Sequence, residues 1–148
     1  MTKILILTTG PMRIPGRITG DRQGGPPDAV HISIRNPSDI DLKFQLFTDV
    51  FDDTGVGITY PDDVQLIPSN SCLTKTFFFS SIAQPGNILH FYLKGNLDEG
   101  VERLELSFVG QRTSDQMNEP TLFFRNSDLM KVELKQDPLD PPVDPLMH

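Results

Sequence analysis

Short apolar runs that alternate with polar residues, and that end at turn residues, fill residues 29–134. Val30, Ile32 and Ile34 share one face of such a run, because successive side chains of a β-strand point to opposite sides. Residues 42–50 repeat the pattern, and no stretch of helix length shows the helical period of 3.6 residues. The pattern predicts half-buried strands with one wet side, and therefore an all-β chain.

Turn residues divide these runs about every ten positions, as at Asn36–Asp39, where a proline lies between polar turn formers. This spacing favours an antiparallel β-sandwich, jelly-roll or Ig-like, of about eight or nine strands. The strands predicted for its body are 29–35, 42–51, 56–60, 64–67, 72–79, 87–94, 101–109 and 121–125 with 129–134.

The N-terminal region is predicted to be an extended arm. Residues 3–8 read as a short strand, but Gly and Pro occupy nine of the eighteen positions in 10–27, a composition of turns and linkers. We therefore divide the chain into an N-terminal strand with its connector (1–28), a β-sandwich (29–135) and an acidic Pro-rich tail (136–148).

The tail reads QDPLDPPVDPLMH from Gln136 onward. Four prolines in thirteen residues do not sustain a helix or a central strand, so we expect polyproline II or disorder. A passive tail is the interpretation that this composition favours, and a docking ligand is the alternative.

Charge, cysteine content and the lengths of the apolar runs exclude several classes of partner and location. A net charge of −7 and a pI near 4.8 argue against nucleic acid, whose binding depends on clustered Lys and Arg. Cys72 is the single cysteine, so the chain has no intramolecular disulfide, and we expect a small apolar residue in or beside a strand. Ile4–Leu7 is too short for a signal-peptide core, and no apolar run reaches 18 residues, so neither Sec-type export nor a membrane span is expected.

The histidines do not predict a metal site. His31 and His90 lie inside strands, on the face opposite the apolar set, where they are expected near each other on a wet surface. No Cys or His lies at zinc-ligand spacing.

Five aspartates surround two neighbouring loops: Asp49, Asp52, Asp53, Asp62 and Asp63. Their spacing does not match a calcium-binding loop, and carboxylates are common in turns without a metal. No nucleophile, base or phosphate-binding motif emerges, so we expect no cofactor and no enzyme activity.

Phe77, Phe78 and Phe79 form the strongest apolar run. Adjacent residues of a strand face opposite ways, so Phe78 is predicted to point away from its neighbours. One face packs inward, and the other needs cover from a second sheet, a loop or another subunit.

Four segments carry a resemblance that runs from Arg13 onward: Ile14–Arg17 (IPGR), Val30–Ser38 (VHISIRNPS), Ile67–Ser71 (IPSNS) and Leu104–Arg112 (LELSFVGQR). Their order resembles small Firmicute proteins that include subunits of spore and cell-surface appendages. The resemblance implies an Ig-like or jelly-roll subunit that polymerises by lending its N-terminal strand to a neighbour. The paired N-terminal cysteines that cross-link some such fibres are not found in this sequence.

We therefore expect a structural subunit of a homopolymer at a spore or cell surface, joined by β-strand addition. The expected assembly interface comprises Ile4, Leu5, Ile6, Leu7 and Phe78. One alternative is a monomeric or dimeric module that binds protein or carbohydrate through the loops around Asp52 and Asp62. The other alternative is a structural protein of a virion or its tail.

Overall fold

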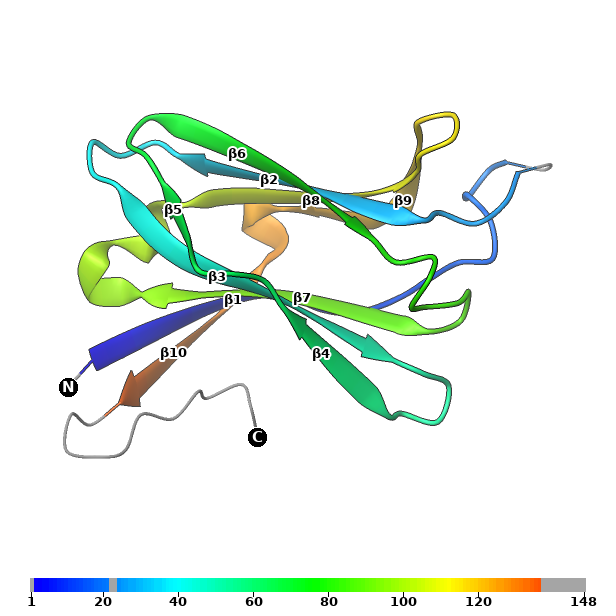
Figure 1. Ribbon diagram of the computed structural model, residues 1–148, viewed down its shortest axis with the longest axis horizontal. Helices are drawn as coiled ribbons and strands as arrows, with labels where there is room; N and C mark the ends of the chain where they lie inside the picture. Colours follow the sequence, from blue (N-terminus) through cyan, green and yellow to red (C-terminus); the bar gives the residue numbers. More distant parts are fainter. Residues whose placement is uncertain (1, 22–23, 137–148) are drawn as a thin grey trace.

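The chain folds into β-strands joined by short loops (Figure 1). The structure, a computed structural model, describes residues 2–21 and 24–136. Within those residues the strands are β1 (Thr2–Arg13), β2 (Ala29–Asn36), β3 (Leu42–Phe51), β4 (Gly57–Pro61), β5 (Gln65–Ile67), β6 (Ser71–Phe78), β7 (Ile88–Asn96), β8 (Glu105–Arg112), β9 (Met117–Arg125) and β10 (Met130–Gln136). Three 3-10 helices accompany them: η1 (Leu97–Glu99), η2 (Val101–Arg103) and η3 (Asn126–Asp128).

Two antiparallel sheets form the body. Sheet A has the order β10-β1-β7-β3-β4, with β5 also paired to β3, and sheet B has the order β6-β2-β8-β9. The prediction of an all-β chain with antiparallel strands is confirmed, with ten strands in the described residues instead of eight or nine. The sheets lie face to face in a sandwich-like arrangement.

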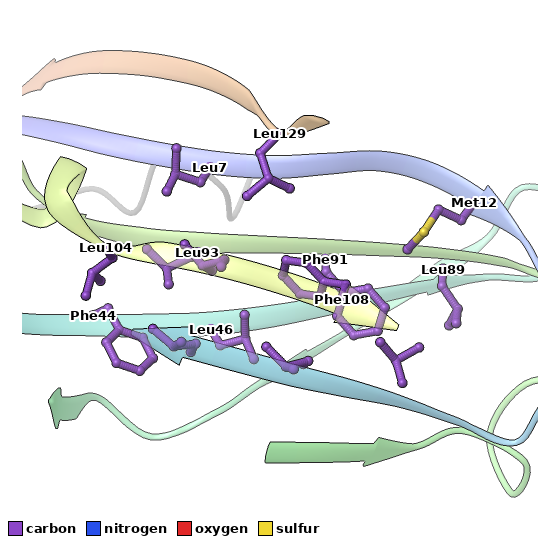
Figure 2. Packing of buried hydrophobic residues seen from close by; sticks show 14 of the residues in the cluster. Leu7, Met12, Phe44, Leu46, Leu89, Phe91, Leu93, Leu104, Phe108 and Leu129 are labelled. Carbon is purple, nitrogen blue, oxygen red and sulfur yellow. The ribbon is translucent and has the colours of Figure 1, made fainter. Parts of the chain in front are cut away.

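The core lies between the sheets and collects the apolar side of each alternating strand. Val30, Ile32 and Ile34 are buried in it, as their spacing predicted. Phe91 of β7 meets Phe108 of β8 with ring centroids 5.4 Å apart, so the two sheets contact each other through aromatic rings. Figure 2 shows these rings together near the middle of the cluster.

The N-terminal strand is not a free arm, which corrects the prediction. β1 lies inside sheet A, with β10 on one side and β7 on the other, so both of its edges are paired within the chain. Leu5 and Leu7 belong to the core. The physical reason is that a strand with apolar residues on both faces buries more surface inside its own sheet than at a single edge.

An irregularity near Thr9 lets β1 continue past a glycine and a proline. The pairing with β7 shifts register between Thr8 and Pro11, and Gly10 has a φ of +73°, a left-handed conformation that favours glycine. The Thr9 hydroxyl accepts a hydrogen bond from the Phe91 amide (3.1 Å). A side chain thus supplies one partner of the ladder at the bulge.

The connector between β1 and β2 is also anchored, contrary to the expected tether. Ile14 and Ile18 are both 1% exposed, and Ile14 exchanges backbone hydrogen bonds with the loop before β7, through Gly86 and Asn87. The expected units 1–28 and 29–135 therefore share one core. Apart from Gln136, which ends β10, the expected tail lies outside the described residues.

Across the part of the chain that the structure describes, no helix is long and apolar enough to cross a membrane.

Candidate functional site: the open seam

Two edge strands leave one side of the sandwich open. β4 ends sheet A, β6 ends sheet B, and between them lies a cavity of about 250 Å³. The cavity is lined by Ile32, Leu46, Thr48, Tyr60, Pro61, Asp62, Lys75, Thr76 and Phe77. We call this cavity and the two edge strands beside it the open seam. Figure 1 shows β4 beside the end of β3, at the edge of sheet A.

Aromatic rings connect the open seam to the core. Tyr60 of β4 and Phe77 of β6 have centroids 6.5 Å apart, and Phe77 meets Phe91 edge to face at 5.7 Å. Through these contacts, the inner wall of the seam packs against aromatic residues of the core. The wall is therefore a preformed surface.

One charged pair lies in the seam. Lys75 alternates with Leu73 and Phe77 on the inward side of β6, and its ammonium pairs with Asp62. Partial burial lowers the pKa of the Lys75 ammonium. An inward-pointing charge on an edge strand discourages indiscriminate strand pairing. In the sequence, the signal for this pair is a lysine placed between two inward apolar residues, Leu73 and Phe77.

Phe78 points outward from the end of β6, as predicted, and is 59% exposed, whereas Phe79 is buried. Ile58 of β4, across the seam, is 60% exposed. Other large apolar residues near these edges are also exposed: Val56, Val64, Leu66 and Ile82. Apolar side chains thus flank the open seam on both strands.

The other four residues of the expected interface do not join Phe78. β1 is separated from β4 by β7 and β3 in sheet A. Leu5 and Leu7 lie in the core, and Ile4 and Ile6 lie on the opposite, outer face of the same sheet. The expected interface therefore splits into a core pair, an outer-face pair and one seam residue.

The connector between β1 and β2 packs beside β9, the edge strand of sheet B opposite β6, where a buried carboxylate holds it in place. Glu119 of β9 is fully buried and accepts hydrogen bonds from the Thr19 amide (2.6 Å), the Thr19 hydroxyl (3.0 Å) and the Thr121 amide (3.0 Å). Burial by itself would raise the pKa of this carboxyl, but the hydrogen bonds from Thr121 and Thr19 outweigh burial and lower it. No sequence motif marks Glu119 as a buried carboxylate.

Arg112 at the end of β8 secures the rest of the connector. Its guanidinium donates to the carboxylates of Asp21 (2.7 Å) and Asp115 (2.6 Å), and to the Gly25 carbonyl (2.8 Å). Hydrogen bonds to Asp115 and Asp21 raise the pKa of this group further, so it stays charged. The glycine-rich segment that resembled a tether is fixed by one arginine.

The two histidines lie on the outward faces of different sheets, which corrects the expectation that they are neighbours. His90 of β7 contacts the Thr8 hydroxyl and, at 3.0 Å, the Asp49 carboxylate. His31 of β2 contacts Gln111 and Thr76 on sheet B. The sequence could not predict whether these two histidines are neighbours, because alternation shows which face of a strand a side chain occupies but not which sheet the strand joins.

The two acidic loops, around Asp52 and around Asp62, border different cavities. Asp52 accepts hydrogen bonds from the Thr54 hydroxyl and from the amides of Thr54 and Val56, so it shapes its own turn. The hydroxyl bond to Thr54 is the largest cause that lowers its pKa. Asp52 borders a cavity of about 750 Å³ with Arg13, whereas Asp62 lies in the seam. Within residues 2–21 and 24–136, no three His, Cys, Asp or Glu side chains gather as metal ligands.

Cys72 lies in β6, as predicted, but it is exposed and does not pack as an apolar residue. Its strand position places it on the outward side of the edge strand, like Phe78. The physical reason is that the outward face of β6 is open to solvent.

Comparison with known proteins gives little. No protein-family model matches the sequence, and no curated protein matches it. The chain is similar to a solved structure titled "Crystal Structure of Thermotoga maritima 1070", with 9% identity, coverage of 86% of this chain and 90% of that chain, and a TM-score of 0.41. A likeness at this score carries no argument about fold or function.

Proposed function

We propose that this protein is a non-enzymatic structural subunit that associates with further copies of itself through the open seam. The observation that carries the proposal is the exposure of Phe78 and Ile58 on two edge strands that flank one cavity. Large apolar side chains that line an exposed edge commonly mark interaction sites. The spore or cell surface implied by the resemblance is the setting that we propose for the assembly.

The seam supports association between copies in a defined geometry. Each edge strand has one row of backbone groups outside the sheet pairings, which a strand of a neighbour satisfies by β-augmentation. Lys75 restricts the register in which a partner strand approaches, because its charge must keep contact with Asp62 or water. Seam-to-seam contact uses the same surface on both copies, so it closes as a dimer, which is the unit that we propose.

Strand addition by residues 3–8 is not part of this proposal. β1 has a partner on each side, and removing it from sheet A would expose Leu5 and Leu7 to water. We therefore propose that copies associate through Phe78 and the open seam and not through the N-terminal strand.

Sedimentation velocity across a concentration series tests the proposal. The wild-type chain should form dimers, and Phe78→Ser together with Ile58→Ser should weaken dimerisation by at least tenfold while the circular dichroism spectrum stays unchanged. Phe123→Ser is the matched control, because Phe123 is a similarly exposed phenylalanine on β9, away from the seam. A wild-type chain that remains monomeric at high concentration would contradict the proposal.

A second candidate is a module that binds a polar ligand, favoured by the cavity of about 750 Å³ at the loop end of sheet A. Its lining includes Arg13, Asp52, Asp53 and Asn87, and its volume lies within the usual range for ligand sites. A glycan array and a thermal-shift screen, each repeated with Arg13→Ala, test it. Binding that survives this substitution, or no binding, would exclude this cavity.

A further inference from the structure

A shallow cavity of about 320 Å³ lies on the face of sheet B that points away from sheet A. Ser33 and Arg35 of β2 line it, and they alternate with the core residue Ile34. In the strand register, Ser107 of β8 is opposite Ser33, and Arg125 of β9 is opposite Ser107. Three neighbouring strands therefore present two hydroxyls and two guanidinium groups to one cavity, which we call the two-arginine cavity.

The neutral donors of this cavity are open to a ligand. Within residues 2–21 and 24–136, neither the Ser33 nor the Ser107 hydroxyl has a hydrogen-bond partner. Asn126, which follows β9, lines the cavity beside them, and its Oδ1 accepts a hydrogen bond from the Leu106 amide (3.3 Å). That bond fixes the side chain and leaves the Asn126 NH2 group as a third donor.

Arg125 brings a guanidinium that is not already neutralised. In the described part of the chain, no carboxylate lies within ion-pair distance of it. The Asp128 carboxylate, which is close in sequence, accepts from the Arg125 backbone amide (2.9 Å) and so caps η3. The Arg125 Cζ lies 5.9 Å from the centroid of the Phe123 ring, a cation–π contact that holds the guanidinium over the sheet.

Arg35 is only loosely paired. Its Nη1 lies 3.6 Å from the Glu105 Oε1, and the two side chains are 62% and 50% exposed. An exposed pair at this distance is weak, and it leaves most N–H groups of the guanidinium free. The lining thus carries two positive groups and one negative group, although the whole chain has a net charge of −7.

The arrangement of the donors selects the shape of the ligand. Two guanidinium groups, two hydroxyls and one amide come from three strands and from η3, so they do not lie in one plane. A planar carboxylate offers two oxygens, whereas a phosphate or sulfate group offers three or four in different directions. Arginine also binds such oxyanions through paired, charge-assisted hydrogen bonds.

We propose that the two-arginine cavity binds a tetrahedral oxyanion, either a free ion or the phosphate or sulfate group of a small ester. Arg35 and Arg125 supply the charge, and Ser33 and Ser107 donate hydrogen bonds from the floor. Glu105 opposes binding, because its carboxylate competes for Arg35 and repels the anion. The cavity shares no lining residue with the open seam, so this site does not depend on the proposed self-association.

An NMR titration of the full chain tests the site. Inorganic phosphate, sulfate and phenyl phosphate are added at constant pH and ionic strength, and saturable shifts are expected at the amides of Ser33, Ser107 and Asn126. Arg35→Gln combined with Arg125→Gln should weaken binding at least tenfold. Arg17→Gln, the same change at an exposed arginine of the connector, is the matched control and should leave the affinity unchanged. Shifts that do not saturate, or that persist in the double variant, would overturn the proposal.

Glu105→Gln provides a readout that a merely structural role would not give. Removal of the competing carboxylate should tighten phosphate binding at least threefold, and an unchanged or weaker affinity would contradict the assigned geometry. Acetate at the same ionic strength should not saturate, and binding as tight as that of phosphate would refute the preference for a tetrahedral anion. Tighter binding of phenyl phosphate than of inorganic phosphate would support an ester as ligand, and the reverse order would support the free ion.

Discussion

The two sides of the sandwich differ in a way that composition does not reveal. The connector side is rich in Gly and Pro, yet Ile14 and Ile18 are buried there and Glu119 binds Thr19. The open seam is built from regular strands, yet Phe78 is largely exposed. The comparison teaches that regular secondary structure and tight packing are separate properties, because a few anchors fix a linker while a well-formed edge strand stays unpaired.

The difference between the connector side and the open seam is also the reason why we propose the seam as the interaction surface. Closing the connector side uses hydrogen bonds that have no apolar substitute, so that side is committed to the fold. The seam retains apolar surface beside a single ion pair, and a partner is able to bind it without dismantling the core.

Removing residues 1–12 should have the largest effect. The deletion takes a central strand out of sheet A, leaves β10 without its partner and exposes the core, so we expect loss of cooperative unfolding. Circular dichroism and a thermal melt measure this. A truncated protein that remains folded and β-rich would show that the N-terminal strand is a free arm, as the sequence predicted, and is not part of the fold.

Ile18→Ala should cost about 2 to 5 kcal/mol in the free energy of unfolding, because the side chain is 1% exposed and leaves a cavity. Ile58→Ala, the same change on the seam, should cost less than about 0.5 kcal/mol at 60% exposure. Urea unfolding of both variants compares the two sides directly. Similar losses for the pair would show that the seam is packed as tightly as the connector side.

Glu119→Ala should cost about 1 to 3 kcal/mol, because it leaves the Thr19 and Thr121 donors without their acceptor. The folded-state pKa of Glu119 is lowered, so its contribution is present above the ordinary value of 4.5 and is lost as pH falls through the folded pKa. Denaturant unfolding from pH 7 to pH 3 should show a smaller acid-induced loss in Glu119→Ala than in wild type. Parallel pH profiles would indicate that Glu119 does not hold the connector as a carboxylate.

Lys75→Met should change the free energy of unfolding by no more than about 1 kcal/mol, since an apolar residue of similar volume replaces one partner of a partly exposed pair. It should, however, raise the tendency to associate, because the edge strand loses its inward charge. Light scattering against concentration checks this, with Thr74→Met on the outward side of the same strand as control. Equal association of the two variants would remove Lys75 from our account of the seam.

The sequence predicted local features of the strands well, but not the features that depend on distant segments. Alternation located most strands to within a few residues and assigned Val30, Ile32, Ile34 and Phe78 to their correct faces. It failed for His31 and His90, whose pairing depends on which sheet each strand joins. It also missed Glu119 and Lys75, because a buried carboxylate and an inward lysine are defined by partners far away in the chain.

The sequence by itself determined the strands and the direction in which their side chains point, since a period of two residues is a local property of the extended backbone. The tertiary structure alone decided that the first strand lies between β10 and β7, that the connector is anchored, and that the seam is the open side. These outcomes depend on contacts between distant segments, and such contacts are chosen by the total apolar surface and hydrogen bonding of the whole chain.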